Sequence, residues 1–342
     1  MRRTSHVLAI LIPIALAAST APAAAIYMDP LYGIGITKDV EYTKAATSNK
    51  GLVGLKLDIY QPTDIGLAPL LATRPAIVIQ DGGAWVSADK GNGRVTTIAN
   101  YMAQRGYTVV VADYRQGANN LFGAGGDVVP IVGQTAFGSQ PYAGLSVPAL
   151  YQIFPGTTAI RAGIEDFAVA MAWTRSNAAM LGIDPNRIAA AGGSAGGIDN
   201  LMLQYNNNPV NPAYAAQAVI GLVSSLYGNE SRVKPSGPPV FLLNNTADLV
   251  VPWSPNMDAA FANAGIYYEQ WFQPTDATYH NVDWDLNLGG VNLKERVRDF
   301  LANHFAGGPI EVPEPSTWVL GFTAAVAFGV IRLRKRSAAR RS

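Results

Sequence analysis

Short apolar runs alternate with segments of helical periodicity along the middle of this chain, and the alternation constrains its fold more than any other feature. Residues 76–80 and 107–112 are continuous apolar runs next to Pro, Gly or Asp, which is typical of strands buried on both faces. Other predicted strands are 187–191, 218–223, 240–243 and 267–272, and the predicted helices are 97–105, 164–180, 195–205, 255–264 and 291–305. This order predicts one α/β domain with a mostly parallel central sheet and helices on both faces. Residues 41–43 and 55–60 are expected to add antiparallel edge strands.

Composition excludes several classes of protein. The chain has 342 residues, of which 49% are hydrophobic and none is cysteine. Disorder, a disulfide scaffold, a thiol nucleophile and Cys-ligated metal sites are therefore excluded. Residues 26–311 hold 17 basic and 23 acidic side chains, a net charge of −6. A mildly acidic body argues against nucleic acid as a partner, because phosphate binding needs a basic surface.

The N-terminal residues 1–25 have the features of an export signal. Arg2 and Arg3 precede a short apolar run at 7–18, and three alanines at 23–25 supply small residues for cleavage. The run is shorter than the roughly 20 residues that span a bilayer. We expect a signal peptidase to remove this segment from an exported protein.

The C-terminal residues 312–342 have a different pattern. Pro313-Glu314-Pro315 precedes an apolar run at 318–331, which is followed by a basic cluster beginning at Arg332. The segment resembles the PEP-CTERM sorting signal of Gram-negative bacteria. The resemblance implies processing by an exosortase-type enzyme, transient inner-membrane insertion, and delivery to the cell surface or extracellular matrix. The alternative is a short transmembrane helix that is retained as an anchor.

Residues 116–160 interrupt the alternation, because they contain no clear helix or strand. They are rich in glycine and aromatic residues, including Tyr142 and Phe154. Loops of this length inside a domain are usually functional. We expect a lid-like excursion that brings Tyr142 and Phe154 to the substrate, and a structural lobe with its own small core is the alternative.

The sequence Gly-Gly-Ser-Ala-Gly at 192–196 follows a predicted strand and opens a predicted helix. This is the context in which a G-x-S-x-G motif forms a sharp turn that exposes a nucleophilic serine. Ser194 is therefore the predicted nucleophile. The amide of Ala195, at the helix N-terminus, is a predicted oxyanion donor.

A serine hydroxyl needs a base, and the chain has three histidines. His6 lies in the export signal and His304 near the end of the closing helix, so His280 is the predicted base. Asp248 follows a predicted strand, and its order after Ser194 and before His280 predicts a triad acid. The rival acids Asp276, Asp283 and Asp285 lie close to the histidine in sequence.

Residues 82–85, Gly-Gly-Ala-Trp, follow the first buried strand, and we call them the oxyanion loop. Glycine lets a backbone approach a ligand closely, so the amides of Gly83 and Ala84 are predicted oxyanion donors. Trp85 is a candidate substrate contact. The alternative is a tight turn with a buried tryptophan.

These motifs together resemble the α/β-hydrolases of the esterase/lipase group, which includes hormone-sensitive-lipase-like and feruloyl-esterase-like enzymes. The similar stretches are 79–85, 112–115, 182–188, 246–248 and 251–252, within residues 50–305. The family usually has histidine where this chain has Asp81, and His-Gly where it has Asn244-Asn245. Neither departure removes a triad residue, and the first bears on how the oxyanion loop is held.

The sequence thus predicts a secreted serine hydrolase of carboxylic esters that forms an acyl-enzyme and needs no metal or organic cofactor. Its substrate would be a small ester or an esterified polymer. Two alternatives remain. One is a non-catalytic matrix-binding module on the same fold. The other is an amide or formamide hydrolase, because residues 82–85 also resemble the oxyanion loop of kynurenine formamidases.

Overall fold

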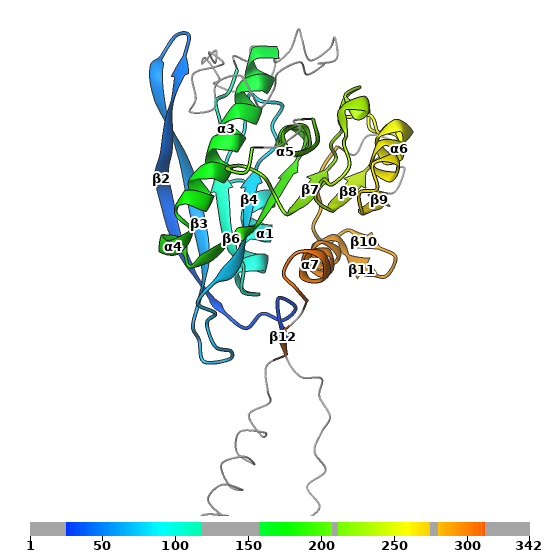
Figure 1. Ribbon diagram of the computed structural model, residues 1–342. Coiled ribbons are helices and arrows are strands. Elements are labelled where there is room, and N and C mark those ends of the chain that lie inside the picture. Colours follow the sequence, from blue (N-terminus) through cyan, green and yellow to red (C-terminus); the bar gives the residue numbers. More distant parts are fainter. Residues whose placement is uncertain (1–24, 118–156, 207–210, 274–279, 309, 312–342) are drawn as a thin grey trace, which may run out of the picture. The chain divides into compact units, whose positions relative to one another are not determined.

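Eight strands form the central sheet of the computed structural model, in the order β2-β3-β5-β4-β6-β7-β8-β9 (Figure 1). The strands from β5 to β9 run parallel, whereas β3 is antiparallel to both β2 and β5. Their bounds are β2 Gly33–Thr47, β3 Gly51–Thr63, β4 Arg74–Gln80, β5 Thr108–Ala112, β6 Ile183–Gly193, β7 Ala218–Leu222, β8 Val240–Asn244 and β9 Tyr268–Phe272. The mostly parallel sheet predicted from the alternation is therefore confirmed.

The structure describes residues 25–117, 157–206, 211–273, 280–308 and 310–311, which belong to one compact unit, Ala25–Val312. The predicted export signal, sorting signal and most of the predicted excursion lie outside the described residues. Among the helices that are described, none is long and apolar enough to cross a membrane.

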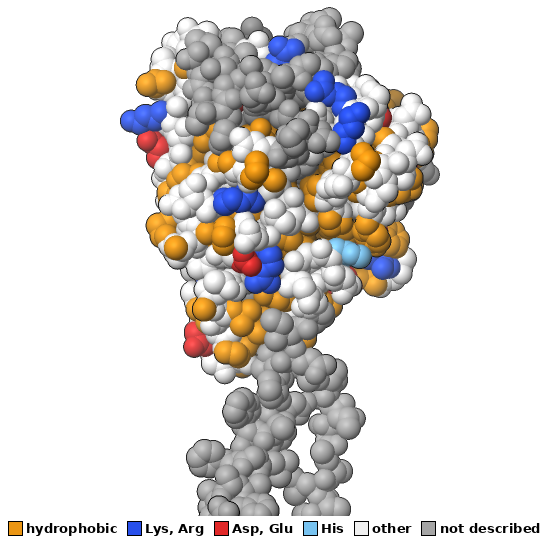
Figure 2. Space-filling view, in the orientation of Figure 1, with side chains coloured by type: hydrophobic (Ala, Val, Ile, Leu, Met, Phe, Trp, Pro, Cys, Tyr) orange, Lys and Arg blue, Asp and Glu red, His pale blue; other side chains and the backbone are white. Residues whose placement is uncertain are grey.

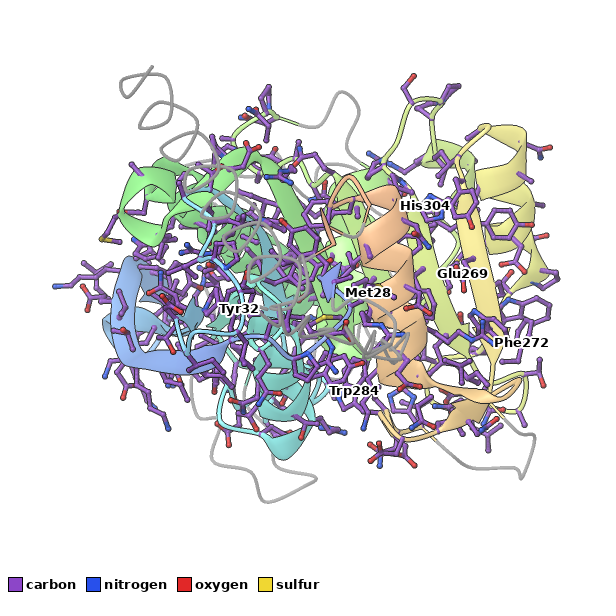
Figure 3. All side chains as sticks on the ribbon, turned by 90° about the horizontal axis from the view of Figure 1, so that it is seen from below. Met28, Tyr32, Glu269, Phe272, Trp284 and His304 are labelled. Carbon is purple, nitrogen blue, oxygen red and sulfur yellow. The ribbon has the colours of Figure 1, made fainter. Side chains whose placement is uncertain are left out.

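Helices cover both faces of the sheet (Figure 1). α1 (Gly93–Ala103) and α7 (Leu293–His304) contact each other on one face, and α3 (Thr157–Ser176) and α5 (Ala195–Tyr205) pack together on the other. α4 spans Ala178–Leu181 and α6 spans Pro255–Asn263. In Figure 3, seen from below, α7 runs along the near face with β9 beside it.

Alternation along the parallel strands explains how both faces are filled, because successive strand residues point to opposite sides. In β4, Ala76 and Val78 belong to the apolar core that includes α3 and α5. Ile77 and Ile79 instead line a cavity together with residues of α1 and α7. The apolar runs are continuous because neither face of these strands meets water. Figure 2 shows that charged side chains are few and scattered on the face it presents, as expected for a chain with 14% charged residues.

Several predicted elements differ from the structure in extent. The short edge strands at 41–43 and 55–60 are parts of a long hairpin, β2 and β3, whose outer residues are exposed and so lack an apolar run. The helix predicted at 164–180 is two helices, because the chain leaves helical geometry at Asn177 before α4. α1 begins at Gly93, since the side chain of Asn92 accepts a hydrogen bond from the amide of Arg94 at 3.0 Å.

Five short elements were not predicted. β1 (Ala25–Ile26) pairs antiparallel with β12 (Ile310–Glu311), so the two ends of the described chain meet. β10 (Asn287–Leu288) pairs with β11 (Val291–Asn292) just before α7. A 3-10 helix, η3, spans Glu230–Arg232. Segments of two or three residues have no periodicity by which a sequence could reveal them.

Candidate active site

Ser194 lies on a sharp turn between β6 and α5. Its backbone has φ 52° and ψ −122°, a conformation that residues with a Cβ rarely adopt. The amide of Ser194 donates to the carbonyl of Leu222 at 2.8 Å, which fixes the turn against β7. A Cβ at Gly196 would lie 2.2 Å from the carbonyl oxygen of Gln80, so only glycine lets α5 begin this close to β4. The second glycine of the motif is therefore a packing requirement.

The structure brings Ser194, His280 and Asp248 together in one chain of hydrogen bonds. The Oγ of Ser194 lies 2.7 Å from Nε2 of His280, and Nδ1 of His280 lies 2.6 Å from Oδ2 of Asp248. A carboxylate can only accept, so Nδ1 carries a proton and Nε2 is left to accept the serine proton. This is the arrangement that a serine nucleophile needs from a base and an orienting acid.

Asp248 accepts hydrogen bonds from the backbone as well as from His280. Its Oδ1 accepts hydrogen bonds from the amides of Val250 at 2.8 Å and Val251 at 2.9 Å. Burial raises the pKa of this carboxyl, but the bonds from His280 and the two amides outweigh burial, and the net pKa is lowered. Asp248 therefore stays ionised and can stabilise an imidazolium.

The rival acids are not placed to do this. Asp283 and Asp285 are exposed, and Asp285 forms an ion pair with Lys294. Asp276 lies outside the described residues.

The oxyanion loop lies against the serine turn. A Cβ at Gly82 would be 3.0 Å from the carbonyl oxygen of Gly193 and 3.1 Å from Cβ of Ser194. Gly83, Ala84 and Trp85 follow with φ values of 104°, 52° and 59°, three consecutive residues in the left-handed region. Within the described residues, nothing accepts a hydrogen bond from the amides of Gly83, Ala84 or Ala195. These amides remain available to an oxyanion.

Trp85 corrects one sequence prediction. Its side chain is only 1% exposed, and its Nε1 donates to Asp199 on α5 at 2.9 Å. The indole therefore points into the protein, away from the side on which a substrate would bind. The expectation of a substrate contact is wrong, because the indole belongs to the apolar core that includes residues of α3 and α5. Tyr142 and Phe154, the other candidate substrate contacts, lie outside the described residues.

A small cavity, about 50 Å³, opens beside Ser194 and His280 and extends between the sheet, α1 and α7. Its inner walls are apolar. They are formed by Ile77, Ile79, Val95, Ile98, Met102, Ala191, Ile220, Leu222, Val297 and Leu301. Polar side chains are confined to the end near the triad, where Asp81, Arg94 and Asn281 contribute to the lining. An apolar space with a few polar groups at its mouth is the usual form of a small-molecule site.

Three residues that sequence reasoning missed connect α1 to the loop that carries His280. Nη1 of Arg94 donates to Oδ1 of Asn281 at 3.1 Å, and Nε1 of Trp284 donates to the carbonyl of Arg94 at 2.6 Å. Figure 3 shows Trp284 between α1 and the start of α7. Since Asn281 follows His280 directly, these bonds restrain the position of the imidazole. No local motif indicates contacts that span about 190 residues.

Asp81, which replaces the histidine of the esterases that the sequence resembles, is buried on the wall of this cavity. Its Oδ2 accepts from the amide of Asp89 at 3.3 Å, and its Oδ1 lies 3.9 Å from Nη2 of Arg94. Burial raises the pKa of Asp81, and Arg94 and neighbouring hydrogen bonds offset part of the rise. The other difference from those esterases is Asn244-Asn245 in place of His-Gly. These two side chains have a structural role, since Asn244 donates to the carbonyl of Ser224 and Asn245 accepts from the amide of Ala247.

Comparisons with known proteins agree with this architecture. A family model described as BD-FAE matches residues 136–219, which include the serine turn. No curated protein matches the chain. Among solved structures, the apo form of Thermogutta terrifontis esterase 2 has a TM-score of 0.55 at 21% identity, covering 83% of this chain and 97% of that chain.

Two further structures of that protein are similar. The form phosphorylated by paraoxon has a TM-score of 0.52 at 21% identity, covering 80% of this chain and 93% of that chain. The butyrate-bound form has a TM-score of 0.52 at 22% identity, covering 80% of this chain and 94% of that chain. With its mostly parallel sheet and its serine turn between β6 and α5, the chain has the α/β-hydrolase fold.

Proposed function

We propose that this protein hydrolyses carboxylic esters through Ser194, His280 and Asp248. The observation that carries the proposal is the continuous relay from Oγ of Ser194 through the imidazole to a buried, ionised carboxylate. Fold alone would leave the activity open, because one fold hosts many functions.

In the first half-reaction, Oγ of Ser194 attacks the acyl carbon while Nε2 of His280 takes the hydroxyl proton. The amides of Gly83, Ala84 and Ala195 donate to the oxyanion that forms. The bond to the alcohol oxygen then breaks, and His280 gives its proton to that oxygen. An acyl group remains on Ser194.

In the second half-reaction, water attacks the acyl-serine while His280 takes one of its protons. The carboxylic acid leaves, the proton returns to Oγ, and Ser194 is restored. Asp248 keeps the proton of the neutral imidazole on Nδ1 and stabilises the imidazolium in both halves. The apolar cavity beside Ser194 would receive a short acyl group.

Hydrolysis of p-nitrophenyl acetate and butyrate by the full chain tests the proposal. We expect turnover by the wild type and a fall of about 10⁴-fold or more in kcat for Ser194→Ala and His280→Ala. Ser231→Ala is the matched control, because Ser231 is exposed on η3 and does not line the cavity beside Ser194 and His280, and its kcat should be unchanged.

A single-turnover arm uses paraoxon, which phosphorylates the Thermogutta esterase. We expect one diethyl phosphate on Ser194 by intact mass, with release of one p-nitrophenolate, and no adduct on Ser194→Ala. A folded wild type with neither turnover nor adduct would favour the non-catalytic binding module. Faster cleavage of a matched anilide or formamide than of the ester would favour the amide hydrolase.

We also infer that the protein is exported by its N-terminal signal and sorted by its PEP-CTERM-like tail. The basis is the sequence pattern of residues 1–25 and 312–342. Secretion to a surface or matrix would make esterified matrix polymers a natural substrate class. N-terminal sequencing and intact mass of the protein from a Gram-negative host that carries an exosortase test this inference. Retention of both ends would contradict it.

A further inference from the structure

Asp199 is a buried carboxylate that the proposed mechanism does not use. It lies on α5, five residues after Ser194, and has no exposed surface. Its Oδ1 accepts the hydrogen bond from Nε1 of Trp85 at 2.9 Å, and its Oδ2 accepts one from Nε2 of Gln80 at 3.0 Å. Trp85 belongs to the oxyanion loop, and Gln80 is the last residue of β4. One side chain therefore joins the nucleophile-bearing helix to the strand and loop beside it.

This position is a costly place for a carboxylate. Both donors are neutral, and no described Lys or Arg forms an ion pair with Asp199. Burial raises its pKa well above the usual value. An apolar side chain at this inward-facing helix position would avoid the desolvation cost. Unlike an apolar side chain, however, the carboxylate can accept hydrogen bonds from both Trp85 and Gln80.

The packing around this contact is tight. A Cβ at Gly163 of α3 would lie 2.5 Å from Oδ2 of Asp199 and 2.8 Å from Cδ1 of Trp85. α3, α5 and the oxyanion loop thus close around the carboxylate–indole pair, and the indole has no room to rotate. The pair is a fixed connection between two elements.

The oxyanion loop needs such a connection, because the positive φ values of Ala84 and Trp85 disfavour its conformation. At its first residue, the hydroxyl of Tyr114 donates to the carbonyl of Gly82 at 3.0 Å. At its last residue, the indole of Trp85 is held by Asp199, and the carbonyl of Trp85 accepts from the amide of Gly117 at 2.8 Å. The amides of Gly83 and Ala84 lie between these two attachment points. The second point is on the same helix whose first amide, that of Ala195, is the third oxyanion donor.

We propose that Asp199 is a positioning residue of the oxyanion hole, which holds Trp85 so that the amides of Gly83 and Ala84 stay aligned with that of Ala195. The inference rests on the proposed ester hydrolysis. Asp199 contacts no reacting atom. Its effect passes through the indole to the loop backbone.

Loss of the connection should lower kcat more than it raises KM. The oxyanion exists only near the transition state, so misaligned donors weaken transition-state binding and leave ground-state binding largely intact. Removal of a whole oxyanion donor costs about 10²–10³-fold in kcat. We expect a smaller fall, about 10- to 100-fold, for Asp199→Ala and for Trp85→Phe, with KM changed less than about threefold.

Two further variants separate positioning from general stability. Asp199→Asn should keep most of the activity. Its amide oxygen can accept from Trp85, and its NH₂ can donate to Oε1 of Gln80 once the Gln80 amide, whose Nε2 faces Asp199 in the wild type, turns over. Asn200→Ala is the matched control. Asn200 is equally buried on α5, but its Nδ2 donates to the carbonyl of Ile220 at 2.9 Å and not to the oxyanion loop. It should lower the melting temperature and leave kcat unchanged.

The experiment measures kcat, KM and melting temperature for the full chain and these variants on p-nitrophenyl butyrate. In parallel, the indole N–H signals of the six tryptophans are recorded by ¹H–¹⁵N NMR, and Trp85→Phe assigns the signal of Trp85. That signal should move upfield in Asp199→Ala and stay in place in Asn200→Ala. Trp85→Phe removes the donor without removing a ring, so the kinetic test does not depend on Asp199→Ala being stable.

The inference would be overturned if Trp85→Phe and Asn200→Ala lost equal amounts of kcat at equal losses of melting temperature. It would also be overturned if the indole signal of Trp85 did not move in Asp199→Ala. A wild type without ester turnover would instead defeat the proposed function. The NMR arm would still report whether the connection exists, so the two failures are distinguishable.

Discussion

At the scale of single residues, the direction of one hydrogen bond determines whether Ser194 can be activated. Asp248 can only accept, and this fixes the proton of His280 on Nδ1 and leaves Nε2 free to accept. The remaining oxygen of Asp248 is occupied by the amides of Val250 and Val251. The two backbone amides therefore orient Asp248, and Asp248 in turn orients His280.

This arrangement makes Asp248→Asn informative. The amide oxygen would face the two backbone donors, so the NH₂ would face Nδ1 of His280 and donate to it. The imidazole would then carry its proton on Nε2 and could not accept from Ser194. We expect kcat to fall about 10⁴-fold while the fold is kept. A fall of less than about tenfold in steady-state kinetics would show that Asp248 does not set the tautomer.

Asp81 places a negative charge near the site of a developing oxyanion. Its pKa is raised by burial, so it is neutral at low pH and becomes charged as the pH rises through that raised pKa. Like charge opposes the oxyanion. We expect the ratio of kcat/KM for Asp81→Asn to that of the wild type to rise with pH and reach about tenfold at most.

Taking this ratio cancels any pH dependence that both proteins share. Asp64→Asn is the control, because Asp64 is an exposed carboxylate just after β3 whose Oδ1 accepts from the amide of Gly66 and which does not line the cavity. Its ratio to wild type should remain close to one across the pH range. A ratio for Asp81→Asn that does not vary from the ordinary carboxyl pKa of about 4 upward would show that its charge does not reach the reaction.

At the scale of elements, the junction of β6 and α5 carries most of the site. The strand ends just before Ser194 at the carboxyl edge of the sheet, and α5 begins immediately after this serine, with no acceptor for its first amide among the described residues. The helix can begin there only because Gly196 lets it approach β4. The glycine in the serine motif and the packing of α5 against β4 therefore have the same cause, which is the close approach of the two backbones.

Gly196→Ala tests that cause. Its Cβ would lie 2.2 Å from the carbonyl oxygen of Gln80, so α5 would have to shift. We expect a loss of about 2 kcal/mol or more in the free energy of unfolding by urea, together with loss of activity. Gly93→Ala, at the start of α1, meets nothing within 4 Å and should change stability by less than about 1 kcal/mol. Equal stability of the two variants would contradict the packing argument.

At the scale of the whole molecule, a buried ion cluster joins the chain on either side of residues 118–156. Arg115, just after β5, contacts Glu165 at 2.7 Å and Asp166 at 2.8 Å on α3, and all three side chains are fully buried. Burial raises the pKa of Asp166 to about 6, although Arg115 opposes the rise. The cluster fixes α3 relative to the sheet.

Removal of the cation should therefore destabilise the whole domain. Arg115→Met would leave two buried carboxylates without a cation, at a cost of about 3–5 kcal/mol in the free energy of unfolding. The triple variant Arg115→Met, Glu165→Gln, Asp166→Asn should recover much of that loss. Lys44→Met is the control, because its 3.9 Å pair with Glu41 is 63% and 48% exposed, and surface pairs contribute about 1 kcal/mol or less. Equal losses in the two single variants would refute this assignment.

The sequence by itself determined the order of buried strands and covering helices, the serine turn, and Ser194, His280 and Asp248 as the candidate triad. It could do so because these features are local: a strand buried on both faces is a continuous apolar run, and a serine turn needs glycines at fixed spacing. The strand and serine-turn signals each lie within about ten residues, whereas His280 followed by elimination among three histidines and Asp248 from its order in the chain. The exposed hairpin of β2 and β3 was underestimated for the same reason, since its outer strand has no apolar run.

Only the tertiary structure decided how distant segments meet. It separated Asp248 from Asp283 and Asp285, turned Trp85 into the core, and brought Asp199, Arg94 and Asn281 to the elements that carry the site. These relations depend on strand order and on which side of the sheet each helix packs. They join residues far apart in the chain, so no periodicity or spacing encodes them, and packing of the folded domain is what sets their geometry.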